Sequence, residues 1–285
     1  MNAPSNEVKI GIVADVQYAD APSDAALNRY YPKALSRLKA AVNHFNDAGV
    51  VAVINLGDLI DHGFENFEPV MRAFAKSEAP VYHVPGNHDF EVSTDLVDEI
   101  IPTLAGEAGQ FPRNTALGAR IRLLQLDASR VSLFSALPGS ARHLEATGWL
   151  SEISNGMHLN AKSYNGGLGE DQRGWLREQL RLADGAGERV IIACHQAVFG
   201  GLEKFHLWDC EEVRTILSDF PETVMAWLAG HAHEASATVE NGILHWQAAA
   251  MVDDEEVSAH AIMTADAESL NIDGHGRQPS STWTV

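Results

Sequence analysis

The chain has 285 residues, of which 45% are apolar and 21% are charged, as is typical of a folded globular protein with a large core. Lys and Arg total 20 against 39 Asp and Glu, so the formal net charge is −19. A surface this acidic repels nucleic acids and anionic membranes, which disfavours either as a partner and favours a small-molecule substrate.

The cysteine content and the start of the chain both predict a cytoplasmic protein. Cys194 and Cys210 are the only cysteines, too few for a disulfide framework. Residues 1–7 lack the basic and apolar regions of a signal peptide, and no apolar run is long enough to cross a membrane.

Short apolar runs rich in β-branched residues recur along the chain, and each ends in a polar or glycine-containing turn. They cover residues 8–14, 51–56, 81–84, 121–126, 190–193, 224–228 and 243–247. Runs that are apolar throughout are typical of strands covered on both faces, so we predict seven buried strands.

Three segments between these strands are predicted to be helices. Pro32 begins a segment that runs to Ala48 with apolar residues at three-to-four spacing, and Gly49 is a stop signal. Residues 171–182 and 211–217 are further candidates. This order of elements predicts one mixed α/β sandwich domain over residues 1–285, with residues 130–165 as a candidate lid or rim.

Polar residues that can bind metal ions follow five of the predicted strands. They are Asp15 and Gln17, Asp58, Asn87 with His88, His195, and His231 with His233. Since the carboxyl ends of strands in an open α/β sheet meet at one edge, we expect these side chains to converge. Residues two apart project to the same side of an extended chain, and Asp58 has two oxygens that could bridge two ions.

The ordered motifs D-x-Q, GD, GNHD, H and GHxH resemble those of the calcineurin-like metallophosphoesterases over nearly the whole chain. The resemblance implies a four-layer α/β/β/α sandwich with mixed central sheets. It also implies one metal ion held by Asp15, Gln17, Asp58 and His233. A second ion would be held by Asp58, Asn87, His195 and His231.

Further motifs resemble the manganese-dependent ADP-ribose/CDP-alcohol diphosphatases within that family. They are GIVADVQYAD at 11–20, RYY at 29–31, NGGLGEDQ at 165–172, Trp208 and GHGRQP at 274–279. Gln17 stands where most of the larger family has His. An amide oxygen is a harder ligand than imidazole, so Mn²⁺ is favoured, with Mg²⁺, Fe²⁺ and Zn²⁺ as alternatives.

The chain also departs from this branch around the expected substrate. Gln196-Ala197 follows His195 where the branch usually has Leu-Pro, and Asp209-Cys210 stands where it usually has Asn-Tyr. The pockets for the base and the leaving group are therefore expected to differ.

The expected reaction is cleavage of the diphosphate of a nucleoside diphosphate-X compound by a metal-bridging hydroxide. His88 is the expected general acid, because it adjoins Asn87 and imidazole titrates near neutrality. Asp61 and Asp89 are candidate hydrogen-bond partners for His88 or for a ligand histidine.

Aromatic residues near the motifs are candidates for stacking the nucleobase, and three cations in loops are weaker candidates for binding phosphate. The aromatics are Tyr18, Phe90, Phe199 and Trp208, and the cations are Arg113, Arg130 and Lys162. The remaining histidines are expected to be structural: residues 44, 62, 83, 143, 158, 206, 245, 260 and 275.

Two other functions compete with the diphosphatase. The same metal core could serve a phosphodiesterase acting on cyclic nucleotides or glycerophosphodiesters. From a different class, the chain could be a non-catalytic, metal-dependent scaffold that binds a protein, although a pure binder has no need of an acid such as His88.

Overall fold

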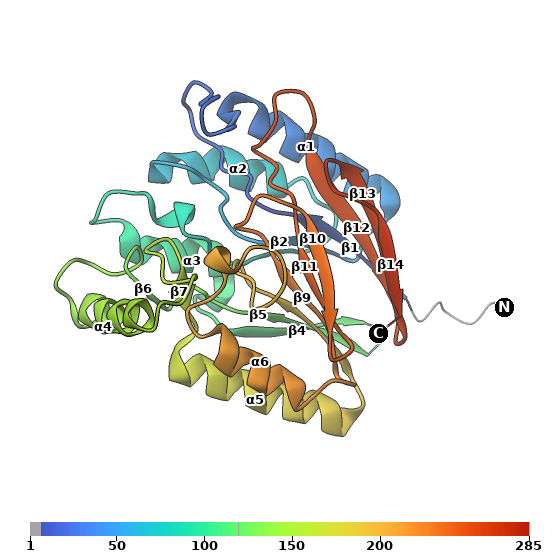
Figure 1. Ribbon diagram of the computed structural model, residues 1–285. Coiled ribbons are helices and arrows are strands. Elements are labelled where there is room, and N and C mark those ends of the chain that lie inside the picture. The colour runs from blue at the N-terminus through green and yellow to red at the C-terminus, as the bar shows by residue number, and fades with distance from the viewer. Residues whose placement is uncertain (1–6, 119, 285) are drawn as a thin grey trace.

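Two six-stranded mixed sheets pack face to face in the computed structural model, which describes residues 7–118 and 120–284. Figure 1 shows α1 (Tyr31–Ala48) and α2 (Phe67–Phe74) on one outer side of the paired sheets. Helices α5 (Gly169–Ala186) and α6 (Cys210–Ser218) lie on the opposite side. The predicted four-layer α/β/β/α sandwich is confirmed.

The first sheet has the strand order β14-β13-β12-β1-β2-β3. Its strands are β1 (Val8–Val13), β2 (Ala52–Asn55), β3 (Val81–His83), β12 (Ala259–Ala265), β13 (Ser269–Gly276) and β14 (Ser281–Thr284). β1, β2 and β3 are parallel, whereas β12 is antiparallel to β1 and begins an antiparallel meander.

The second sheet has the order β10-β11-β9-β8-β5-β4. Its strands are β4 (Arg113–Gly118), β5 (Ile121–Gln125), β8 (Arg189–Ala193), β9 (Val224–Ala229), β10 (Ser236–Glu240) and β11 (Ile243–Gln247). The four inner strands are parallel, and the two edge strands are antiparallel to their neighbours.

The candidate rim at residues 130–165 contains β6 (Val131–Ser132) and α4 (Ala141–Asn155), and β6 pairs with β7 (Gly166–Gly167). Ala146 is the one residue of α4 that is fully buried, where it packs with Trp208. Another helix, α3 (Ile100–Ala105), follows the loop after β3. Within residues 7–118 and 120–284, no helix is long and apolar enough to cross a membrane.

All seven predicted strands and all three predicted helices are present, with ends within a few residues of the expected ones. The sequence pattern missed α2, α3 and α4, the edge strands β4 and β10, and the meander β12–β14. Most of these elements are exposed on one side or very short. Alternating exposure in β4 and β10, for example, leaves no continuous apolar run.

The motif glycine Gly11 has a packing role on the outer face of the first sheet. A Cβ atom added to Gly11 would lie 2.6 Å from Cγ of Phe45, a fully buried residue of α1. The missing side chain lets the helix pack closely against β1, which carries Asp15 at its end.

We predict that Gly11→Ala lowers the free energy of unfolding by about 1–3 kcal/mol, because the added methyl group overpacks this contact. Chemical denaturation measures the change. The loss should be smaller when Gly11→Ala is made in a Phe45→Leu background, since the smaller side chain leaves room. An equal loss in both backgrounds would contradict this account of Gly11.

Candidate metal centre

Seven side chains of types that can bind metal ions converge at the carboxyl ends of five parallel strands. Asp15 and Gln17 follow β1, Asp58 follows β2, Asn87 follows β3, His195 follows β8, and His231 and His233 follow β9. All are buried except the half-buried His233. The structure thus brings together, from both sheets, the residues that the motifs singled out.

Asp58 lies at the middle of this group. Its Oδ2 is 3.1 Å from Nε2 of Gln17 and 3.3 Å from Nε2 of His195. The same Nε2 atom of His195 is also 3.3 Å from Oδ1 of Asn87. Asp58 therefore touches members of both implied ligand sets, as a bridging carboxylate must.

Two of the candidate ligand histidines, His195 and His233, are oriented through their Nδ1 atoms. Nδ1 of His195 donates to the Leu56 carbonyl at 2.7 Å, and Nδ1 of His233 donates to Oδ1 of Asp253 at 2.8 Å. Each therefore presents Nε2 to the centre. Such contacts fix the tautomer and the ring plane of a metal-binding histidine.

His231 is oriented in the opposite sense. Its Nε2 donates to Oδ1 of Asn165 at 2.8 Å, which leaves Nδ1 free to bind an ion. Burial and the charge of the neighbouring His195 hold the pKa of His231 well below its usual range. A neutral imidazole is the form that binds metal.

The backbone at this centre adopts conformations that are rare for residues with side chains. Five of the seven candidates have left-handed φ values: Asp15 51°, Gln17 41°, Asp58 54°, His231 67° and His233 63°. Residues with side chains adopt this region at a cost and hold it where the surroundings impose it, commonly at functional sites. The strain aims these side chains inward.

An orphaned polar atom tests whether the residues fit a metal ion. Oε1 of Gln17 is buried and has no hydrogen-bond partner among the described residues. A buried amide oxygen without a partner is costly, and a cation would satisfy it. Exchanging the amide oxygen and nitrogen turns Oε1 toward Asp58 and His233, two of the three other members of its implied ligand set. The donors fit a pair of divalent cations.

The carboxylate of Asp89 holds the loops that carry these ligands. Its oxygens accept hydrogen bonds from the backbone N–H groups of Leu59 at 2.7 Å, Gly86 at 2.9 Å and Asp58 at 3.1 Å. Asp89 therefore joins the loops after β2 and β3. Its contacts are with the backbone rather than with His88 or a ligand histidine.

His88 lies beside the ligand group in a chain of charged side chains. Its Nδ1 is 3.2 Å from Oδ1 of Asp61 and 3.0 Å from Oε1 of Glu91, while Asp61 also pairs with Arg29 at 2.7 Å. Burial acts to lower the pKa of His88, but the charge of Asp58 and the hydrogen bonds to Asp61 and Glu91 raise it to about 10. The contacts with Asp61 and Glu91 therefore favour the protonated form of this imidazole.

A pocket of about 510 Å³ opens onto this centre. The potential ligands Asp58, Asn87, His231 and His233 line it together with His88, Arg29, Glu91, Asp253, Tyr164 and Phe205. The aromatic rings of Tyr164 and Phe205 are 5.7 Å apart, and each lies within 6 Å of the His231 ring. The pocket thus combines the Arg29 guanidinium, the His88 imidazole and two aromatic rings.

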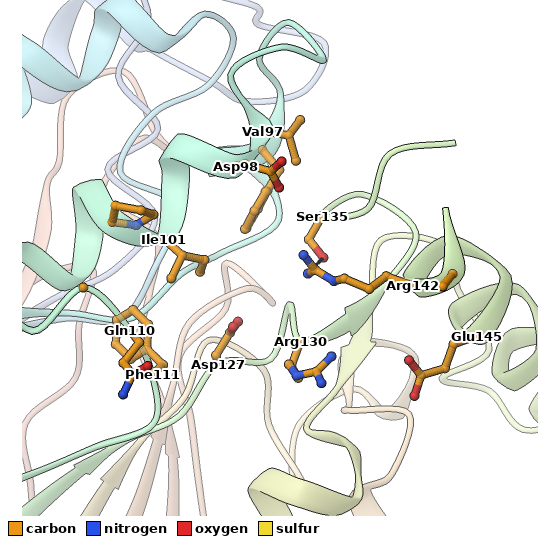
Figure 2. Close-up of a pocket in the computed structure, with 14 residues that line it drawn as sticks. Val97, Asp98, Ile101, Gln110, Phe111, Asp127, Arg130, Ser135, Arg142 and Glu145 are labelled. Atoms are coloured by element: carbon orange, nitrogen blue, oxygen red, sulfur yellow. Dashed lines mark hydrogen bonds between the residues drawn. The ribbon is translucent and has the colours of Figure 1, made fainter. Parts of the chain in front are cut away.

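The aromatic residues proposed from the sequence as stacking partners do not line the pocket at the metal centre. Phe90 lines a second pocket, shown in Figure 2, whose other residues include Asp127, Arg130 and Arg142. Phe199 and Trp208 line a third pocket, and Tyr18 packs against the cluster beneath α1. Arg113, Arg130 and Lys162 are not among the residues lining the pocket at the metal centre. Their contact with substrate stays a prediction.

Several side chains at the centre escaped the sequence pattern. Arg29, Asn165, Tyr164, Phe205 and Asp253 belong to no metal-binding motif, although Arg29 and Asn165 fall within segments that resemble the diphosphatases. No spacing rule could have identified Tyr164, Phe205 or Asp253.

Comparisons with known proteins agree with this geometry. A model of the calcineurin-like phosphoesterase family matches residues 8–235. A protein of Arabidopsis thaliana named manganese-dependent ADP-ribose/CDP-alcohol diphosphatase is 28% identical over 260 residues, which cover 82% of this chain and 83% of the relative. A protein of Mus musculus with the same name is 25% identical over 310 residues, covering 94% and 91%.

A solved structure is also similar over almost its full length. A dimetal phosphatase from Danio rerio has a TM-score of 0.87 and 25% sequence identity to this chain. The match covers 97% of this chain and 98% of that one.

We predict that Gly86→Ala disrupts the centre. A Cβ atom at Gly86 would lie 2.1 Å from Oδ1 and 2.4 Å from the backbone nitrogen of Asp58, so both the carboxylate and its loop must move. Misplacement on this scale costs about 100-fold in activity, and elemental analysis should find less bound metal. Gly148→Ala is the matched control, because a Cβ there meets nothing within 4 Å. Full metal content and full activity in Gly86→Ala would contradict the assigned place of Asp58.

Proposed function

Because the chain belongs to the calcineurin-like phosphoesterase family and is thus a metal-dependent phosphoester hydrolase, we propose that it cleaves nucleoside diphosphate-X compounds. ADP-ribose and CDP-alcohols are the substrates that its relatives' names give. The observation that carries the proposal is the strained, buried set of ligand side chains facing one pocket with His88 and Arg29. Similarity along most of the chain to proteins of that name supports the choice of substrate.

Two divalent ions, with Mn²⁺ favoured, are the proposed cofactors. Asp15, Gln17, Asp58 and His233 would hold one, and Asp58, Asn87, His195 and His231 the other. Four of these seven side chains offer oxygen atoms, which suits Mn²⁺ better than an all-imidazole set would. When bound, such a pair supplies Lewis acidity and a nucleophilic water at neutral pH.

His88 would donate the proton that the leaving phosphate oxygen accepts. Nδ1 is directed at Asp61 and Glu91, so Nε2, which lies 3.3 Å from Nη2 of Arg29, is the nitrogen that would face the substrate. Asp61 is buried and paired with Arg29, and it keeps the imidazole charged and fixes its ring plane. In this assignment, Asp61 acts through His88 as a positioning residue.

Arg29 is the proposed contact for the second phosphate of the diphosphate. Its Nη1 is bound by Asp61, while Nη2 lies 3.3 Å from Nε2 of His88 at the pocket wall. A guanidinium in that place can bind phosphate oxygens close to the proton donor. Tyr164 and Phe205 offer flat faces on the other side of the His231 ring, where a base or an apolar X group could stack.

A substrate panel tests the proposed function. With Mn²⁺, we expect kcat/KM for ADP-ribose or CDP-choline to exceed that for cyclic nucleotides, glycerophosphodiesters and p-nitrophenyl esters at least tenfold. The reason is that Arg29 is placed to contact the second phosphate of a diphosphate, which the other substrates lack. The highest kcat/KM on a cyclic or glycerol diester would favour the phosphodiesterase instead, and a lack of turnover on every ester would favour the scaffold.

His88→Gln tests the proton donor. We expect kcat on ADP-ribose to fall about 10²–10⁴-fold, the usual contribution of a general acid. The loss on a p-nitrophenyl ester should be much smaller, because that leaving group needs little protonation. Glu91→Gln is the matched control and should cost little on either substrate, since Asp61 still holds the ring. Equal losses on the two substrates for His88→Gln would exclude the acid role.

A further inference from the structure

Three histidines that the proposed reaction does not use gather on the outer face of the first sheet. His44 lies in the C-terminal half of α1, His260 in β12 and His275 in β13. None of them is among the residues lining the pocket at the metal centre. One imidazole nitrogen from each lies within 4.8 Å of the other two.

The fold itself holds these rings together. His260 and His275 are directly paired in the antiparallel register of β12 and β13, and their rings stack at 4.8 Å with an interplanar angle of 10°. His44 approaches from the helix above, with Nδ1 3.0 Å from Nε2 of His260. Phe45 packs edge-on against His260 and fixes the depth of the helix.

The chemistry of the group is that of a metal site. Nδ1 of His260 and Nε2 of His275 are buried and have no hydrogen-bond partner in the part of the chain that the structure describes. All three residues are half-buried.

We infer that His44, His260 and His275 form a second metal site, for a late first-row divalent cation such as Zn²⁺. In a tetrahedral zinc site with Zn–N distances of about 2.1 Å, ligand nitrogens lie about 3.4 Å apart. The observed separations, from 3.0 Å to at most 4.8 Å, span that value. Because the His260 and His275 rings are nearly parallel and an ion lies in the plane of each imidazole that binds it, these rings must turn out of their stack to share one ion.

The donor set distinguishes this site from the metal centre between the sheets. It consists of imidazoles, and the nearest carboxylate oxygen is Oδ2 of Asp273, 3.5 Å from Nε2 of His275. Neutral nitrogen ligands suit Zn²⁺, Ni²⁺ and Cu²⁺, whereas Mn²⁺ and Mg²⁺ prefer oxygen. Asp273 or water would complete the coordination. An ion here would fasten the end of α1 to β12 and β13.

Equilibrium dialysis of the full-length protein against Zn²⁺, followed by elemental analysis, tests the site. We expect His44→Gln and His275→Gln each to bind one Zn²⁺ fewer than the unmodified chain, while Mn²⁺-dependent turnover stays within twofold. His44→Cys, which keeps a zinc ligand, should restore the missing ion. His158→Gln, a change at an exposed histidine outside the group, is the matched control.

A second readout does not depend on the metal centre. Zn²⁺ should raise the melting temperature of the Asp58→Ala protein by several degrees, because an ion that binds only the folded state stabilises it. Adding His275→Gln should abolish that shift. Unchanged zinc stoichiometry in both glutamine variants, or an undiminished shift, would overturn the proposed site. Neither result would bear on the diphosphatase activity, so the two proposals can fail separately.

Discussion

The structure depends on holding five residues in left-handed backbone conformations at the ends of parallel strands. Each such residue costs roughly 1–3 kcal/mol, so the group together costs an amount comparable with the whole stability of a domain. The loops tolerate this because they are tied to one another. The N–H of Asp15 donates to the Gly57 carbonyl, the N–H of Gln17 to the Asp58 carbonyl, and the N–H of Gly230 to the His195 carbonyl.

The same loops bring together two buried carboxylates whose pKa values shift in opposite directions. Burial and the neighbouring charge of Asp58 raise the pKa of Asp15, although the nearby histidines act in the other direction. Burial also acts against the charge of Asp58, but His195 and His88 lower its pKa. Two buried carboxylates among imidazoles are stable in their charged forms when cations lie between them, which agrees with the geometric argument for a metal pair.

The elements that could be predicted from the sequence are those whose structure is determined by a single continuous segment. A buried parallel strand is apolar along its whole length, and the residue after it lies at the sheet edge whatever the rest of the chain does. Helix α4 shows where this reasoning fails, because one buried alanine gives no periodic pattern. The pocket residues Tyr164, Phe205 and Asp253 could not be predicted for another reason. Their positions follow from loop packing between distant segments.

The three outer histidines illustrate the same limit most clearly. His44 and His260 are 216 positions apart, and neither has a ligand at a spacing typical of a metal motif. They are brought together by the register of β12 against β13 and by the depth at which α1 packs on the first sheet. Gly11 and Phe45 determine that depth.

Helix α1 therefore links two sites of different chemistry. Near its middle, Arg37 donates to the carbonyls of Met251 at 3.0 Å and Asp253 at 3.1 Å, and Asp253 orients His233. In its C-terminal half, His44 faces His260 and His275. Selectivity between manganese and zinc depends on ligand type, geometry and metal availability, since zinc binds most sites more tightly. Oxygen donors at the strand ends and imidazoles on the outer face of the first sheet would offer the two ions different ligand types.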